Sequence, residues 1–329
     1  MLNNKSILVT GGTGSFGENF INLILKKYKN IKRLVIFSRD EYKQYNLQKK
    51  FDPKKYKNLR FFLGDVRDID RIKTALNGID IVIHAAALKQ VPTAEYNPFE
   101  FIKTNVLGAE NLINACLNSN VKKVIALSTD KAAAPINLYG ATKLCSDKLF
   151  VSANNIKGKK DISFSVVRYG NVLKSRGSIV PFFQKISKKS KTLPITDMNM
   201  TRFNISLDEA CEFVLMCIKL SKGGEIYIPK IPSFRVVDLA RSIRNDCNFK
   251  IIGIRPGEKI HEEMITINDS LNTLECTTHY VIVPPEKKKF YLKKNKKYKP
   301  VKKDFCYNSF NNKNYLNIKK LSQIIEQYR

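Results

Sequence analysis

The chain alternates short apolar runs with longer segments whose apolar residues recur every three or four positions. The short runs, rich in β-branched and aromatic residues, predict buried strands, and the longer segments predict helices. Strands that alternate with helices favour an α/β protein built on a Rossmann-type, doubly wound parallel sheet. The expected strands are residues 6–10, 33–37, 59–63, 79–87, 124–127 and 163–169.

The alternation loosens after residue 170, although helical patterns continue at 182–186, 208–220 and 236–243. We therefore expect a cofactor-binding domain with the catalytic residues over 1–170 and a smaller α/β substrate-binding region over 171–285. A Lys-rich C-terminal extension, 286–329, holds fourteen basic and three acidic residues. Such an excess of charge is typical of a solvated basic tail, although residues 316–328 have the pattern of an amphipathic helix.

A glycine-rich loop follows the first expected strand directly and leads into a helical pattern. Spaced glycines permit a tight turn and a close approach of backbone to pyrophosphate, while the helix N-terminus offers amide donors to the anion. The strand–loop–helix context distinguishes this loop from an ordinary turn and predicts dinucleotide binding. The candidate cofactor contacts are Gly11, Thr13, Gly14, Ser15, Phe16 and Gly17.

The ends of the next strands extend this candidate cofactor site. An acid at the tip of the second strand is typical of NAD enzymes, but here Ser38 and Arg39 come first, which favours a 2′-phosphate and therefore NADP. Asp65 and Val66 follow the third strand, where an adenine ring could be held. The small residues Ala85, Ala86 and Ala87 end the fourth strand and allow backbone to pass close to the cofactor.

The fifth strand ends in Thr129, Asp130 and Lys131, and Tyr139 and Lys143 follow four residues apart. On a helix that spacing puts Tyr139 and Lys143 on one face. A neighbouring ammonium is expected to lower the pKa of the phenol and make it a usable base. Asp130 and Lys131 add an acid and a base that simple hydride transfer does not need, so the pattern predicts further proton transfers.

Arginines 176, 202 and 255 recur at loop or element boundaries in the second half of the chain. Arginine is suited to bidentate phosphate contact, so the set suggests a nucleotide diphosphate substrate. The candidate substrate contacts are Lys89, Thr129, Asn171, Arg176, Thr201, Arg202, Arg255 and Glu258.

Composition narrows the class of protein. The formal charge of +29 could indicate a nucleic-acid or membrane partner, but no nucleic-acid motif accompanies it, so we favour solvated lysines and an anionic substrate. The seven cysteines and three histidines lack metal-ligand spacing, and no metal site is expected. We see no signal peptide and no membrane-spanning apolar run, and we therefore expect a cytoplasmic protein.

The motifs LSTDKAAAPINLYGATKLCSDKLFVSANN, VVRYGNV, PITDMNMTRF and IIGIRPGEK resemble the extended short-chain dehydrogenase/reductase superfamily. Within it the chain resembles the configuration-inverting UDP-N-acetylglucosamine 4,6-dehydratases of pseudaminic acid biosynthesis, from about residue 5 to 285. The resemblance implies a Thr129–Tyr139–Lys143 set supported by Asn105, an Asp130–Lys131 pair for dehydration, and a homo-oligomer with a hexamer as the candidate size. Gln90 and Asn204 depart from it, where histidine and tryptophan are expected.

The resemblance implies a complete reaction. Tyr139 would take the C4 hydroxyl proton during oxidation by NADP⁺, Lys131 the C5 proton, and Asp130 would protonate the leaving C6 hydroxyl. Reprotonation of C5 from the opposite face would invert it. Two alternatives remain open: a UDP-hexosamine 4-epimerase, which needs no second acid–base pair, and a non-catalytic NADP-binding protein.

Overall fold

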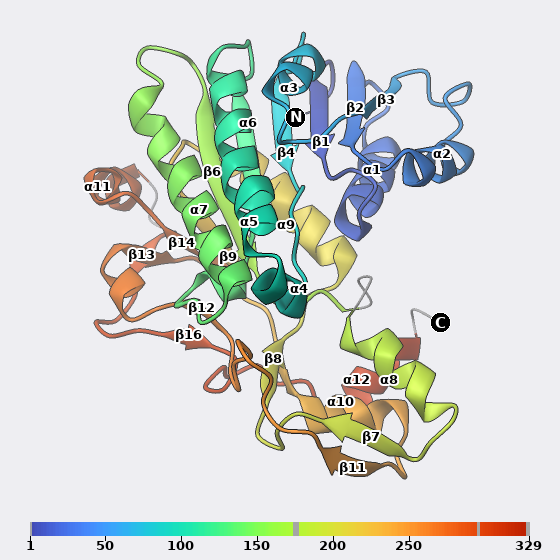
Figure 1. Cartoon of the computed structure of the whole chain (residues 1–329). Coiled ribbons are helices and arrows are strands. Elements are labelled where there is room, and N and C mark those ends of the chain that lie inside the picture. The colour runs from blue at the N-terminus through green and yellow to red at the C-terminus, as the bar shows by residue number, and fades with distance from the viewer. Residues whose placement is uncertain (1, 174–177, 295–296, 327–329) are drawn as a thin grey trace.

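The six expected parallel strands form one side of a ten-stranded sheet, from β6 to the edge strand β3 (Figure 1). The structure is a computed structural model that describes residues 2–173, 178–294 and 297–326. The strand order is β15-β13-β14-β9-β6-β5-β4-β1-β2-β3, parallel from β3 to β9 and antiparallel beyond. The bounds of these strands are β1 Ser6–Thr10, β2 Arg33–Ser38, β3 Leu59–Leu63, β4 Ile81–His84, β5 Lys123–Thr129, β6 Ser163–Tyr169, β9 Ile226–Pro229, β13 Thr273–Glu275, β14 His279–Ile282 and β15 Lys299–Pro300.

Helices cover both faces of the sheet, as a doubly wound fold requires. Helices α3, α6 and α7 pack side by side over one face, and α1 packs against α9 on the other (Figure 1). Their bounds, with those of the helices around them, are α1 Ser15–Lys27, α2 Glu41–Lys50, α3 Ile69–Ala75, α4 Val91–Tyr96, α5 Pro98–Phe101, the π-helix Ile102–Leu107, α6 Gly108–Leu117, the 3-10 helix Asp130–Ala132, α7 Leu138–Ile156 and α9 Leu207–Leu220.

The carboxyl ends of the parallel strands meet at one edge of the sheet. Thr10 at the end of β1 pairs with His84 at the end of β4, and Thr129 at the end of β5 pairs with Tyr169 at the end of β6. Ligands of open α/β sheets bind at this edge. The fourth strand stops at His84 rather than at Ala87, because the amides of Ala85 and Ala86 turn to the Thr10 hydroxyl at 3.2 Å.

The main sheet does not end at residue 170, where the sequence pattern suggested a boundary. Strand β9 adds to β6 in parallel, and β14 then pairs antiparallel with β9. Apolar residues of these later strands, Tyr227, Ile228 and Val281 among them, belong to the main hydrophobic core. The first 170 residues therefore do not complete the sheet on their own.

A smaller region beneath the sheet has its own hydrophobic core, which includes Phe183, Leu193, Phe234 and Leu239 (Figure 1). Three two-stranded sheets, β7–β11, β8–β10 and β12–β16, lie outside the main one in the described part of the chain. The bounds of the remaining elements are β7 Thr192–Ile195, α8 Ile179–Ser187, β8 Thr201–Phe203, β10 Ser233–Arg235, α10 Val236–Ile243, β11 Asn248–Ile251, β12 Glu263–Ile265, the 3-10 helix Asn268–Asn272, α11 Pro285–Lys294, β16 Tyr307–Asn308 and α12 Ile318–Glu326.

The described part of the C-terminal extension packs against the body, although a solvated tail was expected. Tyr291, Tyr298 and Tyr307 join the main core, and Leu321 and Ile325 of α12 join the smaller one. Several of the apolar residues that stand between the lysines of the extension are therefore buried, although Phe290 and Phe310 are exposed. None of the described helices is long and apolar enough to cross a membrane.

Candidate active site

The glycine-rich loop turns tightly between β1 and α1. Gly11 has a φ of +64°, and a Cβ there would lie 2.8 Å from the backbone of Ala85 and Ala86. A Cβ on Gly17 would lie 2.5 Å from Gly12, so the helix packs directly on the turn. The amide of Gly14 donates to the Gly11 carbonyl at 2.9 Å and closes the turn. The loop therefore has the close backbone approach that pyrophosphate binding requires.

A cavity of about 300 Å³ lies over this loop and the strand ends. Ten of the predicted cofactor contacts line it together: Gly11, Thr13, Gly14, Ser38, Arg39, Asp65, Val66, Ala85, Ala86 and Ala87. Ser15, Phe16 and Gly17 lie in the first turn of α1. Asn105, Tyr139 and Lys143 are not among the lining residues.

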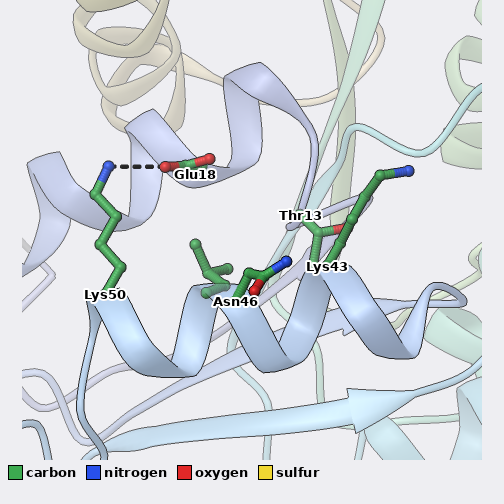
Figure 2. A pocket seen from close by; sticks show the side chains of 6 residues that line it. Thr13, Glu18, Lys43, Asn46 and Lys50 are labelled. Atoms are coloured by element: carbon green, nitrogen blue, oxygen red, sulfur yellow. Dashed lines mark hydrogen bonds and ion pairs between the residues drawn. The ribbon is translucent and has the colours of Figure 1, made fainter.

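Charged side chains gather where this cavity meets the end of β2 and the start of α2. Arg39 Nη1 lies 3.8 Å from Asp65 Oδ2, and Lys43 Nζ lies 2.7 Å from Asp40 Oδ2. Burial alone would raise the pKa of Asp65, but hydrogen bonds and charge from Arg67 outweigh it and hold that pKa below its ordinary value. A second hollow of about 180 Å³ is lined by Thr13, Lys43 and Lys50, among others (Figure 2). Lys50 Nζ lies 2.7 Å from Glu18 Oε1 there.

Asn105 links the turn after β4 to helix α7. Its amide nitrogen donates to the Leu88 carbonyl at 2.9 Å and to Thr142 Oγ1 at 3.1 Å, and its oxygen accepts from the Leu88 amide at 2.9 Å. Asn105 lies in the π-helical segment Ile102–Leu107 and is 1% exposed. Its side chain therefore fixes the turn after β4 against α7, a supporting position rather than one on the cavity wall.

Thr129, Asp130 and Lys131 form a connected cluster at the end of β5. The Thr129 hydroxyl donates to Asp130 Oδ1 at 2.9 Å, and Lys131 Nζ donates to the same oxygen at 3.1 Å. The other oxygen, Oδ2, is buried and has no hydrogen-bond partner among the described residues. Burial, reinforced by the charge of Glu262, raises the pKa of Asp130. The raised pKa favours protonation of this carboxyl group, and Oδ2 is the oxygen that no donor occupies.

Lys131 lies between two carboxyl groups. Its Nζ is 3.1 Å from Asp130 Oδ1 and 2.7 Å from Glu262 Oε1. Burial alone would lower the pKa of this ammonium, but the two acidic neighbours outweigh it and raise that pKa. Asp130 raises that pKa most, and Glu262 follows. Lys131 is therefore a cation in the chain without its ligands.

Tyr139 and Lys143 lie on α7, but Lys143 does not lower the pKa of Tyr139 as we expected. Burial raises the pKa of Tyr139 to about 12, and the groups that oppose this rise are Lys131 and a hydrogen bond with Thr129. Burial also lowers the pKa of Lys143, which Asp147 partly offsets. The charge of Lys143 acts on Asp147 and His84 rather than on the phenol.

The predicted substrate contacts of the second half reach the catalytic cluster through a chain of ion pairs. Arg255 Nη2 lies 2.9 Å from Glu258 Oε1, which lies 3.4 Å from Arg202 Nη2. Arg202 Nε is in turn 3.7 Å from Glu262 Oε1. The segment that carries these residues also docks on the catalytic loop, because Asn137 donates to the Gly257 carbonyl at 2.7 Å.

The other predicted substrate contacts are more scattered. The Thr201 hydroxyl is buried against His261 Nδ1 at 2.8 Å and Ser309 Oγ at 2.7 Å, so it is engaged within the protein. Asn171 follows β6 and has a buried side-chain oxygen with no described partner. Lys89 is exposed at the turn after β4, and Arg176 lies outside the described residues. Of the two residues that differ from the pattern of the resembled family, Gln90 is exposed and Asn204 is buried.

Comparisons with known proteins agree with this geometry. The family described as "Polysaccharide biosynthesis protein" matches residues 7–284. The chain belongs to this family. A UDP-N-acetylglucosamine 4,6-dehydratase (inverting) of Campylobacter jejuni is 52% identical over 334 residues, with 99% of this chain and 98% of the relative covered. A UDP-glucose 4-epimerase of Rickettsia typhi is 38% identical, with 99% and 96% covered.

Solved structures of similar proteins confirm the fold class. Pen from Bacillus thuringiensis superimposes with a TM-score of 0.91 at 35% identity and covers 100% of this chain and 99% of its own. The dTDP-glucose 4,6-dehydratase DesIV of Streptomyces venezuelae, solved with NAD bound, has a TM-score of 0.70 at 23% identity, with 78% and 86% covered. The resemblance inferred from the motifs is confirmed by these polysaccharide biosynthesis relatives.

Two residues of this site were missed in the sequence. Lys43 lines the cofactor cavity one helical turn after the acid that caps α2. Glu262 contacts Lys131, yet it belongs to no recognised motif. No strand pattern marks it, because Glu262 precedes β12 and both Met264 and Ile265 of that strand are fully buried.

Proposed function

We propose that this chain is an NADP-dependent, configuration-inverting UDP-N-acetylglucosamine 4,6-dehydratase. Its product would be UDP-2-acetamido-2,6-dideoxy-β-L-arabino-hexos-4-ulose, the first intermediate of pseudaminic acid biosynthesis for a flagellin or other surface glycan. The proposal draws on the 52% identical relative of that name and on the arrangement of acids and bases at the end of β5.

The observation that carries the proposal is the pairing of a buried carboxyl group, whose pKa is raised, with a lysine beside the reacting tyrosine. Asp130 is 1% exposed, and its unpartnered Oδ2 can give a proton to the departing C6 hydroxyl. Lys131, bonded to the other oxygen of the same carboxyl, takes the C5 proton. Elimination of water needs both groups at once, and transfer at C4 alone needs neither.

Tyr139 is the base for the C4 hydroxyl. Thr129 hydrogen-bonds the phenol and Lys131 adds positive charge, and both favour the phenolate against the effect of burial. The bound nicotinamide would accept hydride from C4 and return it to C6. Lys131 then returns a proton to C5 from the face opposite the original hydrogen, which inverts that carbon.

The residues of the cofactor cavity fit NADP. The loop from Gly11 to Gly17 would hold the pyrophosphate, and Asp65 and Val66 the adenine. Arg39, directly after β2, and Lys43, in the first turn of α2, would bring two cations to a ribose 2′-phosphate, with Asp65 and Asp40 as their present partners. The NAD bound by DesIV makes NAD the alternative cofactor.

The substrate side fits an anionic nucleotide sugar. Arg202 and Arg255 converge on Glu258, and they would meet the diphosphate, for which guanidinium groups are suited. A homo-oligomer, with a hexamer as the candidate size, completes the proposal. Light scattering of the purified protein would test this assembly.

The test is incubation of the purified protein with UDP-N-acetylglucosamine in D₂O, with NADP⁺ and NAD⁺ in parallel, followed by NMR and mass spectrometry. We expect loss of one water, a new C6 methyl and deuterium at an inverted C5, with NADP⁺ giving the faster reaction. Water loss with retained C5 would contradict the inversion, and an unchanged sugar would contradict the activity.

The second candidate is a UDP-hexosamine 4-epimerase, which the 38% identical Rickettsia typhi relative favours. Tyr139 and Thr129 would suffice for it. The same experiment separates the two, because an epimerase gives the C4 isomer with no loss of water.

A further inference from the structure

Glu262 is a buried acid that the proposed reaction does not yet use. Its side chain is 2% exposed, and Oε1 lies 2.7 Å from Lys131 Nζ. The second oxygen, Oε2, is buried without a hydrogen-bond partner among the described residues. An ionised carboxylate with one oxygen unpaired is costly to bury, so this arrangement calls for a functional reason.

Lys131 needs a proton acceptor before it can act as the base at C5. A lysine can take the C5 proton only as the neutral amine, yet here it is held as an ammonium between two carboxyl groups. Asp130 cannot relieve it, because Asp130 must stay protonated to act as the acid toward the C6 hydroxyl. The remaining acceptor within hydrogen-bond distance in the described chain is Glu262.

The fold holds Glu262 firmly against Lys131. Strand β12 begins at the next residue and pairs antiparallel with β16 of the C-terminal extension, Glu263 opposite Asn308. The Glu262 amide donates to Ser309 Oγ at 2.9 Å, and the Ser309 amide donates to the Glu262 carbonyl at 2.8 Å. The backbone of Glu262 is thus clamped from both sides, and its side chain points toward the end of β5.

We propose that Glu262 is a positioning residue that takes a proton from the Lys131 ammonium and thereby prepares the amine that attacks the C5 proton. This inference rests on the proposed dehydratase function. It assigns the buried, unpaired oxygen of Glu262 to temporary storage of that proton.

The proton count closes with no change in net charge. The N–H bond of Lys131 breaks and an O–H bond forms on Glu262, which turns a cation and an anion into two neutral groups. Lys131 then takes the C5 proton while Asp130 gives its own to the leaving hydroxyl, so a cation and an anion form together. When Lys131 has returned its proton to C5, Glu262 gives back the stored one. Asp130 has lost one proton and Tyr139 has gained one from the C4 hydroxyl, so reprotonation of Asp130 and deprotonation of Tyr139 complete the cycle.

Other charged groups around the pair define the field in which this transfer occurs. Burial would raise the pKa of Glu262, but the charge of Lys131, followed by those of Arg202 and Lys259, outweighs burial and lowers that pKa, so the proton stays on Lys131 until this field changes. Asp130 acts on Lys131 from the β5 end. Because Arg202 belongs to the proposed diphosphate contact, a bound substrate would share that cation and leave Glu262 a better proton acceptor.

The test compares Glu262→Gln with the wild type and with Glu263→Gln as a matched control. Gln keeps the shape and the contact with Lys131 but cannot take its proton. Glu263 is the next residue along the chain, and its carboxylate accepts from Cys306 at 2.9 Å on the other side of the strand. The readouts are formation of reduced cofactor at 340 nm in a single turnover and deuterium entry at C5 in D₂O, both between pH 6 and 8.

We expect Glu262→Gln to form reduced cofactor normally, because C4 oxidation does not involve Lys131 as a base. Its deuterium entry at C5 should fall by about 10- to 100-fold near pH 7. The rate should then rise about tenfold per pH unit, since Lys131 must lose its proton to solvent, whereas the wild-type rate stays nearly flat. Glu262→Asp should recover part of the rate, and Glu263→Gln should match the wild type.

Three results would overturn the inference. Wild-type deuterium entry in Glu262→Gln would show that Lys131 needs no such partner, and equal losses in cofactor reduction and C5 exchange would make Glu262 a purely structural residue. If the wild type itself released no water from the sugar, the proposed function would fail and this inference with it. If the wild type releases water and Glu262→Gln keeps the wild-type rate of deuterium entry, this inference fails and the proposed function stands.

Discussion

Replacing Leu321 by alanine tests whether the basic C-terminal extension is part of the folded body. Leu321 lies on α12, which packs against α10, and its side chain is 0% exposed within the smaller core. Ile325 lies one turn further on the same face and is 3% exposed. If this packing holds in solution, truncating Leu321 leaves a cavity in the core.

The size of the effect follows from the burial. Leu→Ala at an enclosed site costs about 2–5 kcal/mol, the sum of lost transfer energy and the cavity left behind. The complete burial of Leu321 places it near the middle of that range, about 3 kcal/mol. At roughly 2 °C per kcal/mol for a chain of this size, the melting temperature should fall by about 6 °C.

The assay is thermal unfolding of the full-length protein, followed by circular dichroism, with Lys320→Ala as the control. Lys320 is the adjacent residue and is exposed, so its truncation should cost no more than about 0.5 kcal/mol. Equal melting temperatures for the two variants would refute the packing of α12 and would show that the extension is a solvated tail.

Three further predictions follow from the site. Asp130→Asn keeps the contacts of Oδ1 but has no acid proton, so water loss should fall by about 10²- to 10⁴-fold while C5 deuterium exchange continues; equal loss of both would contradict the role of Asp130. Arg39→Ala should lower the preference for NADP⁺ over NAD⁺ about tenfold in kcat/KM, and an unchanged ratio would argue against a 2′-phosphate site. His84 has its pKa lowered to about 3 by burial, so the unfolded chain binds the proton first as pH falls from 6.5. Stability should therefore drop by about 2 kcal/mol between pH 6.5 and 5, and His84→Gln should remove that part of the slope in urea unfolding.

The strands and the cofactor loop could be predicted because local sequence determines them. The run from Ser6 to Thr10 and the run from Leu59 to Leu63 match β1 and β3 residue for residue. An apolar run of that length between turn signals forms few structures other than a buried strand. A glycine-rich loop between a strand and a helix predicts a phosphate-binding turn from its own sequence. The arrangement of Thr129, Asp130 and Lys131 follows from the same logic, since they are neighbours in the chain.

Contacts between distant segments could not be predicted in this way. Nothing local indicates that β9 continues the sheet beside β6, or that β16 pairs with β12, because both depend on the packing of helices between them. The prediction that Lys143 lowers the pKa of Tyr139 was wrong for the same reason. The spacing to Lys143 was visible in the sequence, but the burial that raises that pKa depends on the whole fold.

The C-terminal extension shows both the part that local sequence predicts and the part that depends on distant contacts. Its net charge suggested a tail, since charge is counted over a segment, whereas burial is decided residue by residue. Ser309 of that extension contacts both the backbone of Glu262 and the Thr201 hydroxyl, so a segment far from the motifs positions a side chain beside Lys131. Weakening the packing of the extension should therefore impair proton transfer at C5 before it impairs cofactor binding, because the glycine loop and its cavity lie on β1, β2 and β4, which the extension does not contact in pairing.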